Sequence, residues 1–453
     1  MAVLRIGNAQ GFWGDRGDAP AELVKQAPDL DVLTLDYLAE VSLSIMAVQR
    51  DKDPSAGFAR DFLKVVKSLA PVWKSGRKLK LVTNAGGLDP KACAAAVVDA
   101  LRKEGVTGLK VGLVTGDDVL PLLKERDDSA FANWETKQSI AEVRDQLVTA
   151  NAYVGAEAAV EALAEGADIV VCGRLADPSM AVAPCIHKFG WKATDYDKIA
   201  GATVAGHLIE CGTQATGGIF TDWLRIPEND RIGFPIVEVS EDGSCILTKP
   251  DGTGGVATVR TVKEQLLYEI GDPARYLSPD ATVSFLNLSV EQVGKDRVRV
   301  GGAKGSPPPD TYKVSAAYRA GFRVMGMLTV VGKDAVAKAK RAGEVLLSRL
   351  ERAGMKPARS VVECLGSGDA VGRVLGGPKP EDLRETVLRI CIEDPRKEVC
   401  ERLAGEIAPL VTSGPQGVTG YAEGRPNVRP VFGYWPCLVK RSDVRLAVET
   451  MTL

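Results

Sequence analysis

The chain has 453 residues, about three times the common domain size of ~150 residues, so we expect two domains. With 45% hydrophobic and 26% charged residues, it is neither a disordered nor a fibrous chain. The 57 basic and 59 acidic residues give a net charge of −2, which argues against a dedicated nucleic-acid binder, because such proteins carry a basic surface.

The first half of the chain alternates short apolar runs with helical patterns. Strands are expected at 3–6, 31–35, 79–83, 111–114, 150–154 and 167–172. Apolar residues at 3.6-residue spacing predict helices at 56–73, from Pro90 to about 101, and at 156–165. This alternation predicts an α/β fold, with a mostly parallel sheet that carries helices on both faces.

Polar and glycine residues follow the ends of these strands. In open parallel sheets, ligands bind beyond the carboxyl ends of the strands, so we expect a binding rim there. The candidate substrate-binding residues at this rim are Asn8, Gly11, Asp36, Asn84, Gly86, Gly87, Arg174 and Asp177. The alternative is that Gly, Asn and Asp at these places form turns only.

The residues between 198 and 218 hold the sharpest local cluster. If 198–211 is a helix, His207, Glu210 and Cys211 share one face, at i, i+3 and i+4. A thiol beside an imidazole can ionise and attack a carbonyl or thioester, and the same groups could instead do acid–base work. The alternative is a helix end capped by Gly212 with a buried cysteine. Free backbone amides could hold an anion in the segment that follows, Thr216-Gly217-Gly218.

Arg174 and Asp177 have two possible roles each. Arg174, just past a buried strand, could clamp a carboxylate or phosphate or form an internal ion pair. Asp177, before Pro178, could contact substrate or cap the helix that follows.

From about residue 236 the pattern changes to short strands and hairpin signals. Strands are expected at 236–240, 245–248, 283–288, 297–300, 313–317, 324–331, 360–364, 386–392, 428–434 and 444–448, with helices at 335–352 and 395–411. This pattern predicts a smaller α+β domain. We therefore assign 1–228 to the parallel α/β domain with the rim, and 229–453 to the α+β domain.

Three glycine-rich segments lie in the second half. Those at 252–255 and 301–305 lack the P-loop pattern and are typical of hairpin turns. The segment 366–372 reads G-x-G-x-x-x-G, which is a weak match to a dinucleotide-binding loop.

The composition also bears on compartment and metal binding. Arg5 interrupts the first apolar run, so no signal peptide is expected, and no stretch reaches the ~18 apolar residues of a membrane helix. Nine irregularly spaced cysteines fit reduced thiols. With only His187 and His207 present, a His/Cys zinc site is not expected, although carboxylates alone could form a magnesium site. We expect a cytoplasmic protein without a membrane partner and assign no metal ligands.

Several of these segments together resemble the acyclic terpene utilisation protein A (AtuA) family. The resemblance covers about residues 4–440 and lies in Arg5-Ile-Gly-Asn8 with Gly11, Asp36-Tyr-Leu-Ala-Glu40, Asn84-Ala-Gly-Gly87, Cys172-Gly-Arg-Leu-Ala-Asp-Pro178, Glu210-Cys-Gly with Gln214-Ala-Thr-Gly-Gly218, Gly233-Phe-Pro-Ile236, and Glu264-Gln-Leu-Leu-Tyr-Glu269 with Asp272-Pro273. It implies a role in degrading citronellol- and geraniol-like terpenes through coenzyme A thioesters, alongside acyl-CoA carboxylases and hydratases. It carries over no catalytic residues.

The leading hypothesis is an enzyme that acts on a branched acyl-CoA thioester or carboxylate, by hydration or carbon–carbon lysis. Glu210, His207 or Cys211 would be acid, base or nucleophile, while Arg174 and the loop 84–87 would hold the anionic end. Coenzyme A would enter as part of the substrate, and other cofactors are left unassigned. The alternatives are a non-catalytic binding or assembly partner of an acyl-CoA carboxylase pathway, and a nucleotide enzyme that uses 366–372. Homo-oligomerisation is expected on general grounds.

Overall fold

The computed structural model describes residues 2–39, 41–53, 55–126, 129–372 and 379–453; Glu40, in one of the segments quoted above, lies outside them. Its contacts divide the chain into unit 1, Met1–Ala317 with Tyr434–Leu453, and unit 2, Tyr318–Gly433. The chain passes between the units in β14 (Thr311–Val331) and β18 (Arg429–Lys440), which pair with each other. The boundary expected at residue 228 lies inside unit 1.

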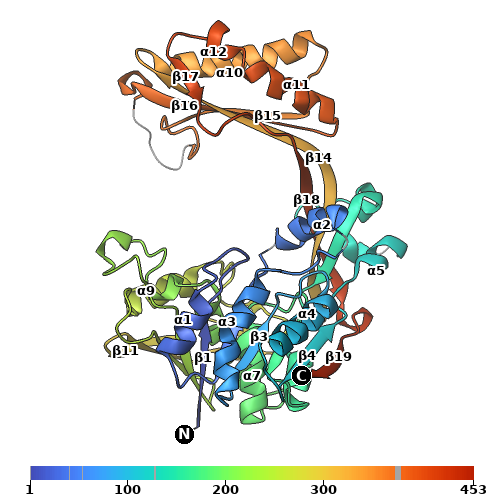
Figure 1. Ribbon diagram of the computed structural model, residues 1–453, viewed down its shortest axis with the longest axis vertical. Coiled ribbons are helices and arrows are strands. Elements are labelled where there is room, and N and C mark those ends of the chain that lie inside the picture. The colour runs from blue at the N-terminus through green and yellow to red at the C-terminus, as the bar shows by residue number, and fades with distance from the viewer. Residues whose placement is uncertain (1, 40, 54, 127–128, 373–378) are drawn as a thin grey trace. The chain divides into compact units, whose positions relative to one another are not determined.

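Unit 1 is built on a ten-stranded mixed sheet (Figure 1). Five parallel strands form its centre, in the order β1 (Val3–Asn8), β2 (Val32–Leu35), β3 (Lys80–Thr83), β6 (Ile169–Val171) and β4 (Lys110–Thr115). Antiparallel strands extend it beyond β1, through β7 (Ile236–Ser240), β8 (Cys245–Thr248), β12 (Arg297–Gly301) and β11 (Ser289–Gly294), and beyond β4, through β19 (Ala447–Thr452). The predicted α/β fold with parallel N-terminal strands is confirmed.

Helices cover both faces of this sheet. One layer holds α1 (Ala19–Gln26), α3 (Phe62–Lys74) and α4 (Pro90–Lys103), which share a core with the strands (Figure 1). The other layer holds α6 (Glu157–Ala164), α7 (Ser179–Phe189) and α8 (Tyr196–Glu210), which contact one another in turn. The apolar spacing in α3 predicts this arrangement, since its Phe62, Val65 and Leu69 are all buried.

Helix α8 is unusual because every residue from Ile199 to Glu210 is buried. Small residues permit this close packing. A Cβ at Gly206 would lie 2.6 Å from the Pro178 carbonyl oxygen, and one at Gly201 would lie 2.2 Å from that of Gly243. The polar residues at the end of α8 are therefore buried. Burial of a charged group costs free energy, so these residues are candidates for a functional role.

Three further α-helices and a small sheet complete the described part of unit 1. They are α2 (Ser42–Lys52), α5 (Leu120–Glu125), α9 (Val259–Leu267) and a small sheet of β9 (Tyr276–Leu277), β10 (Thr282–Ser284) and β13 (Lys304–Ser306). The expected strand at 150–154 is β5 (Leu147–Ala152), and it pairs with β14 instead of joining the parallel sheet. Contacts of α8 with α9, β10 and β13 bring the second half of the chain to this helix.

Unit 2 is a smaller α+β unit with an antiparallel sheet in the order β15 (Arg359–Leu365), β16 (Glu385–Asp394), β14 and β17 (Val418–Tyr421). Its helices α10 (Ala335–Arg352) and α11 (Lys397–Ile407), followed by the short α12 (Leu410–Ser413), share one core with the sheet. The chain order β14-α10-β15-β16-α11-β17 is the split βαβ arrangement. The strands expected at 313–317 and 324–331 are parts of the single strand β14.

Within the described residues, no helix combines the length and the apolar character needed to cross a membrane.

Candidate functional site

The structure brings the predicted polar residues together at the carboxyl ends of the parallel strands. Asn84 joins two strand ends: its Nδ2 donates to Asp36 Oδ1 (2.7 Å), and its Oδ1 accepts from the Tyr37 amide (2.7 Å). Asp117, after β4, accepts from the Arg174 amide and from Asn151 Nδ2, each at 2.8 Å. The rim therefore holds buried polar networks, around Asn84 and around Asp117.

The glycines of the loop 84–87 serve close packing. A Cβ at Gly86 would lie 2.4 Å from the Cys172 carbonyl oxygen, and one at Gly87 would lie 2.3 Å from Met46 Sδ. The two amides are already used, since Gly86 donates to Cys172 O and Gly87 donates to Asn84 O. An anion would have to displace these bonds to be held by this loop.

The loop at 213–218 is also closed on itself. The amides of Thr216 and Gly218 donate to Thr213 O, and that of Gly217 donates to Gln214 O. The Thr216 hydroxyl donates to Gly233 O at 2.7 Å. The three amides of the predicted anion site, Thr216 to Gly218, are therefore already engaged.

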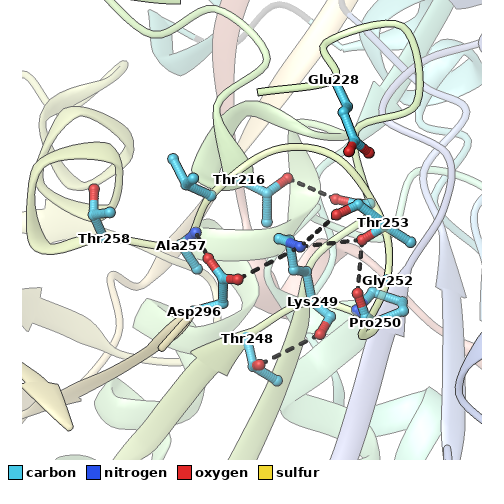
Figure 2. Close-up of polar contacts among 12 residues, drawn as sticks. Thr216, Glu228, Thr248, Lys249, Pro250, Gly252, Thr253, Ala257, Thr258 and Asp296 are labelled. Atoms are coloured by element: carbon cyan, nitrogen blue, oxygen red, sulfur yellow. Dashed lines mark hydrogen bonds and ion pairs between the residues drawn. The ribbon is translucent and has the colours of Figure 1, made fainter. Parts of the chain in front are cut away.

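A buried lysine anchors the neighbouring turn (Figure 2). Lys249 Nζ donates to the carbonyl oxygen (3.0 Å) and the hydroxyl (3.2 Å) of Thr253, and forms an ion pair with Asp296 (3.6 Å). The glycine-rich segment 252–255 is the turn that this amine closes, and Val256 N in turn donates to Thr216 O. Because two hydrogen bonds and an ion pair hold its amine, Lys249 supports the loop rather than acting as a free amine.

Arg174 forms an internal ion pair with Asp177 and keeps a buried donor at Nε. The residue is 1% exposed; its guanidinium donates through Nη1 to Asp177 Oδ1 (2.6 Å) and lies 3.9 Å from the centre of the Tyr153 ring. Its Nε has no acceptor among the described residues. Burial by itself lowers the pKa of Arg174, but the charges around it, that of Asp177 first, raise the pKa well above its usual value. The side chain is a permanent buried cation.

His207 and Glu210 form a hydrogen-bonded pair at the end of α8. His207 Nε2 lies 2.8 Å from Gln265 O, and Nδ1 lies 2.8 Å from Glu210 Oε1. A carbonyl oxygen only accepts, so Nε2 carries a hydrogen, and the second proton is shared between Nδ1 and Oε1. Burial lowers the pKa of His207, but the hydrogen bond with Glu210 outweighs it and the net pKa is raised. The pKa of Glu210 is raised by burial, although its bond with His207 lowers it.

This pairing separates the roles of the two side chains. Both ring nitrogens of His207 are engaged, so the imidazole positions Glu210 and holds a proton beside it. Glu210 Oε2 is buried and has no partner in the described part of the chain. The oxygen that is free to meet a ligand therefore belongs to Glu210.

Cys211 does not sit in an environment that favours a thiolate. Its thiol is half-buried, and burial, followed by the charge of Glu210, raises its pKa. A nucleophilic cysteine needs the opposite shift, which a nearby cation would give.

The charges of the rim and of α8 act on one another. Asp177 raises the pKa of Asp36, of Glu210 and of Tyr276, and Arg174 lowers that of Asp36. In each case burial is the larger cause. These mutual effects place the rim and the α8 pair in one electrostatic site, which we call the rim site: Asp36, Arg174, Asp177, His207, Glu210 and Tyr276.

Asp36 gives a test of this electrostatic description. Burial and Asp177 raise its pKa well above the usual value, so above pH ~4 the folded state binds more protons than the unfolded state, and stability falls as pH rises. We expect Asp36→Asn, which keeps the Oδ1 acceptor, to gain stability relative to the wild type between pH 5 and pH 8, by at most about 1.4 kcal/mol per pH unit. Urea unfolding at both pH values measures this; an equal difference at both would contradict it.

Several residues of the site were not predicted from the sequence. Gln10, Tyr153 and Gln265 each carry side-chain atoms that are buried without a hydrogen-bond partner among the described residues, and Tyr276 packs near the His207 ring, at 6.3 Å between centroids. Gln10 follows the end of β1 and lies between the predicted rim residues Asn8 and Gly11, so its position in the sequence could have identified it as a site residue. Gln265 and Tyr276 come from the second half of the chain, which was assigned to another domain.

A cavity of about 590 Å³ in unit 2 is lined by the glycine-rich segment 366–372 with Lys340, Glu344 and Glu363. Among the described residues, Lys340 is the only cationic residue that lines this cavity, and it is paired with Asp369 at 3.3 Å. In this described part of the lining, three carboxylates and one paired ammonium disfavour nucleotide phosphates. Across the described ranges, no cluster of three or more His, Cys, Asp or Glu residues could hold a metal ion.

The model of one protein family, described as acyclic terpene utilisation family protein AtuA, matches residues 4–450. No curated protein and no solved structure matches the chain.

Proposed function

The chain belongs to the acyclic terpene utilisation family AtuA, and from this premise we propose that it is a catabolic enzyme that acts on a branched acyl-CoA thioester or the related carboxylate. The reaction would be a lyase or hydratase step. The observation that carries this proposal is Glu210 Oε2, a buried carboxyl oxygen without a partner in the described chain, on a side chain held by a proton-sharing histidine.

Both reactions need a group that moves a proton at the substrate. In a lyase step on a 3-hydroxyacyl thioester, Glu210 Oε2 accepts the hydroxyl proton as the C2–C3 bond breaks. The bonding pair passes to the thioester as an enolate, and C3 becomes a carbonyl. In a dehydration, Glu210 takes the C2 proton and returns a proton to the departing hydroxyl, which leaves as water. A general acid–base of this kind contributes about 10²–10⁴-fold.

Arg174 supplies the positive charge that either reaction requires. Negative charge develops on the thioester oxygen in both, and a fixed cation in a buried site stabilises it strongly. The unpartnered Arg174 Nε is the donor we assign to that oxygen. The ion pair with Asp177 and the Tyr153 ring hold the guanidinium in place.

A thermal-shift panel tests the proposal. It contains coenzyme A, branched acyl-CoA thioesters, free dicarboxylates, NAD(P) and ATP. A ligand at about 100 times its Kd adds ~2.7 kcal/mol of stability, which raises Tm by a few degrees for a chain of this size. We expect a rise with branched thioesters, followed by product formation in mass spectrometry. A response to nucleotides alone would contradict the proposal.

One observation favours the alternative of a binding or assembly partner. Exposed apolar side chains gather around α9: Leu224 is 90% exposed, Leu267 75% and Ile219 65%. The segment before Leu224 is tied to α9, because the Thr221 amide and Asp222 bond with Glu264 and Arg260. Exposed apolar patches are typical of interaction surfaces. Thioester binding without turnover would favour this alternative.

A further inference from the structure

Gln10 is a buried amide that the fold itself does not use. It lies just beyond β1, its side chain is 0% exposed, and neither Nε2 nor Oε1 has a partner among the described residues. Asn8, two residues earlier and also buried, donates hydrogen bonds from Nδ2 to the carbonyl oxygens of Ile209 (2.7 Å) and Glu210 (3.1 Å). The same short segment thus holds one satisfied and one unsatisfied amide.

The segment that carries Gln10 lies between the two halves of the rim site. The Gln10 carbonyl oxygen accepts from the Asp36 amide at 3.0 Å. On the other side, the chain meets the end of α8 so closely that a Cβ at Gly11 would lie 2.6 Å from the Gly212 nitrogen. The backbone of Gln10 and Gly11 therefore lies between the loop of Asp36 and the residues that follow Glu210.

Burying both ends of an amide without partners is costly, and native proteins rarely do so without a reason. We propose that Gln10 is a ligand-binding residue, and that its amide takes a neutral group offering one hydrogen-bond acceptor and one donor, such as the carbonyl and hydroxyl of a hydroxy-carbonyl compound. A neutral amide pairs well with such a group, whereas the carboxyl groups of Asp36 and Glu210 nearby disfavour an anion. Identifying the ligand as a 3-hydroxyacyl thioester rests on the proposed function, but the binding role of the amide does not.

The first experiment measures the Tm of the ligand-free protein and of two variants. Gln10→Met has nearly the shape of Gln and removes both unpartnered polar atoms, so we expect Tm to rise by a few degrees. Asn8→Leu is the matched control: it removes an amide that is satisfied, so Tm should fall. If Gln10→Met lowers Tm as Asn8→Leu does, the amide is satisfied in the folded protein, by a buried water for instance, and the proposal is overturned.

The second experiment measures binding by calorimetry, with 3-hydroxyisovaleryl-CoA and isovaleryl-CoA as probes. We expect the wild type to bind the hydroxylated thioester about tenfold more tightly, the effect of one hydrogen bond, and Gln10→Met to lose this preference. A variant that keeps the preference overturns the assignment. If the wild type binds neither thioester, the proposed function fails, and the Tm comparison alone decides the role of Gln10.

Discussion

Glu210→Gln is expected to lower kcat on a branched acyl-CoA substrate by about 10²–10⁴-fold, the range for loss of a general acid–base. The amide fills the same space and can still donate to His207 Nδ1, so the fold should remain intact. However, an amide cannot accept and return a proton at the position of Oε2, the unpartnered oxygen. Steady-state kinetics on the purified variant, with circular dichroism to confirm folding, measures the effect.

The pH profile gives this prediction a second readout. Burial raises the pKa of Glu210, so if the ionised carboxylate is the base, wild-type kcat/KM rises with pH through an apparent pKa above the usual ~4.3 of Glu. This limb should be lost in Glu210→Gln. The pair with His207 titrates as a unit, so the apparent value belongs to both groups.

Cys211→Ser is the matched control for Glu210→Gln. It changes the next residue by one atom and would abolish a covalent thiol mechanism. Because the Cys211 pKa is raised and its thiol stays protonated, we expect kcat within a few-fold of the wild type. Loss of activity in Cys211→Ser with retention in Glu210→Gln would reverse the assignment and make the thiol the nucleophile.

Local sequence patterns were enough to predict the parallel centre of the fold and the helix that carries the pair. Each central strand is a short apolar run, and the helical spacing places His207 and Glu210 on one face, where the structure joins them at 2.8 Å. Both features depend on residues close together in the chain. The same pattern could not predict the partner of the other ring nitrogen of His207, since Nε2 bonds to the carbonyl oxygen of Gln265, a residue that comes from another helix.

The parts that were not predicted depend on pairing between distant segments. β7 extends the sheet by pairing with β1, for example Leu4 with Val239, and no local signal reports a contact over more than 200 residues. For this reason, the hairpin signals of β7 and β8 predicted the start of a second domain. Gln265 reaches the site by the same route, since α9 packs on α8. Tertiary context, not local propensity, decides such placements.

Arg174→Met is expected to reduce the free energy of unfolding by about 3–5 kcal/mol at neutral pH, as when one partner of a buried ion pair is removed. Methionine keeps the apolar length of the side chain, so the loss reports mainly the charge. Asp177 would lose its partner at 2.6 Å, and Asp36 would lose the cation that lowers its pKa. Urea unfolding measures the change, with Arg60→Met as control, because Arg60 forms an exposed ion pair with Asp53 and such pairs contribute little.

The pH dependence of this loss distinguishes charge from packing. Without Arg174 the pKa of Asp36 rises further, so the folded variant binds more protons than the unfolded chain over a wider range, and its stability falls more steeply with pH than that of the wild type. The deficit of Arg174→Met should therefore be larger at pH 8 than at pH 5. A deficit that is the same at both values would mean that the guanidinium acts through its stacking on Tyr153, at 3.9 Å. In that case the cation we assign to the thioester oxygen would not be the electrostatic centre of the site.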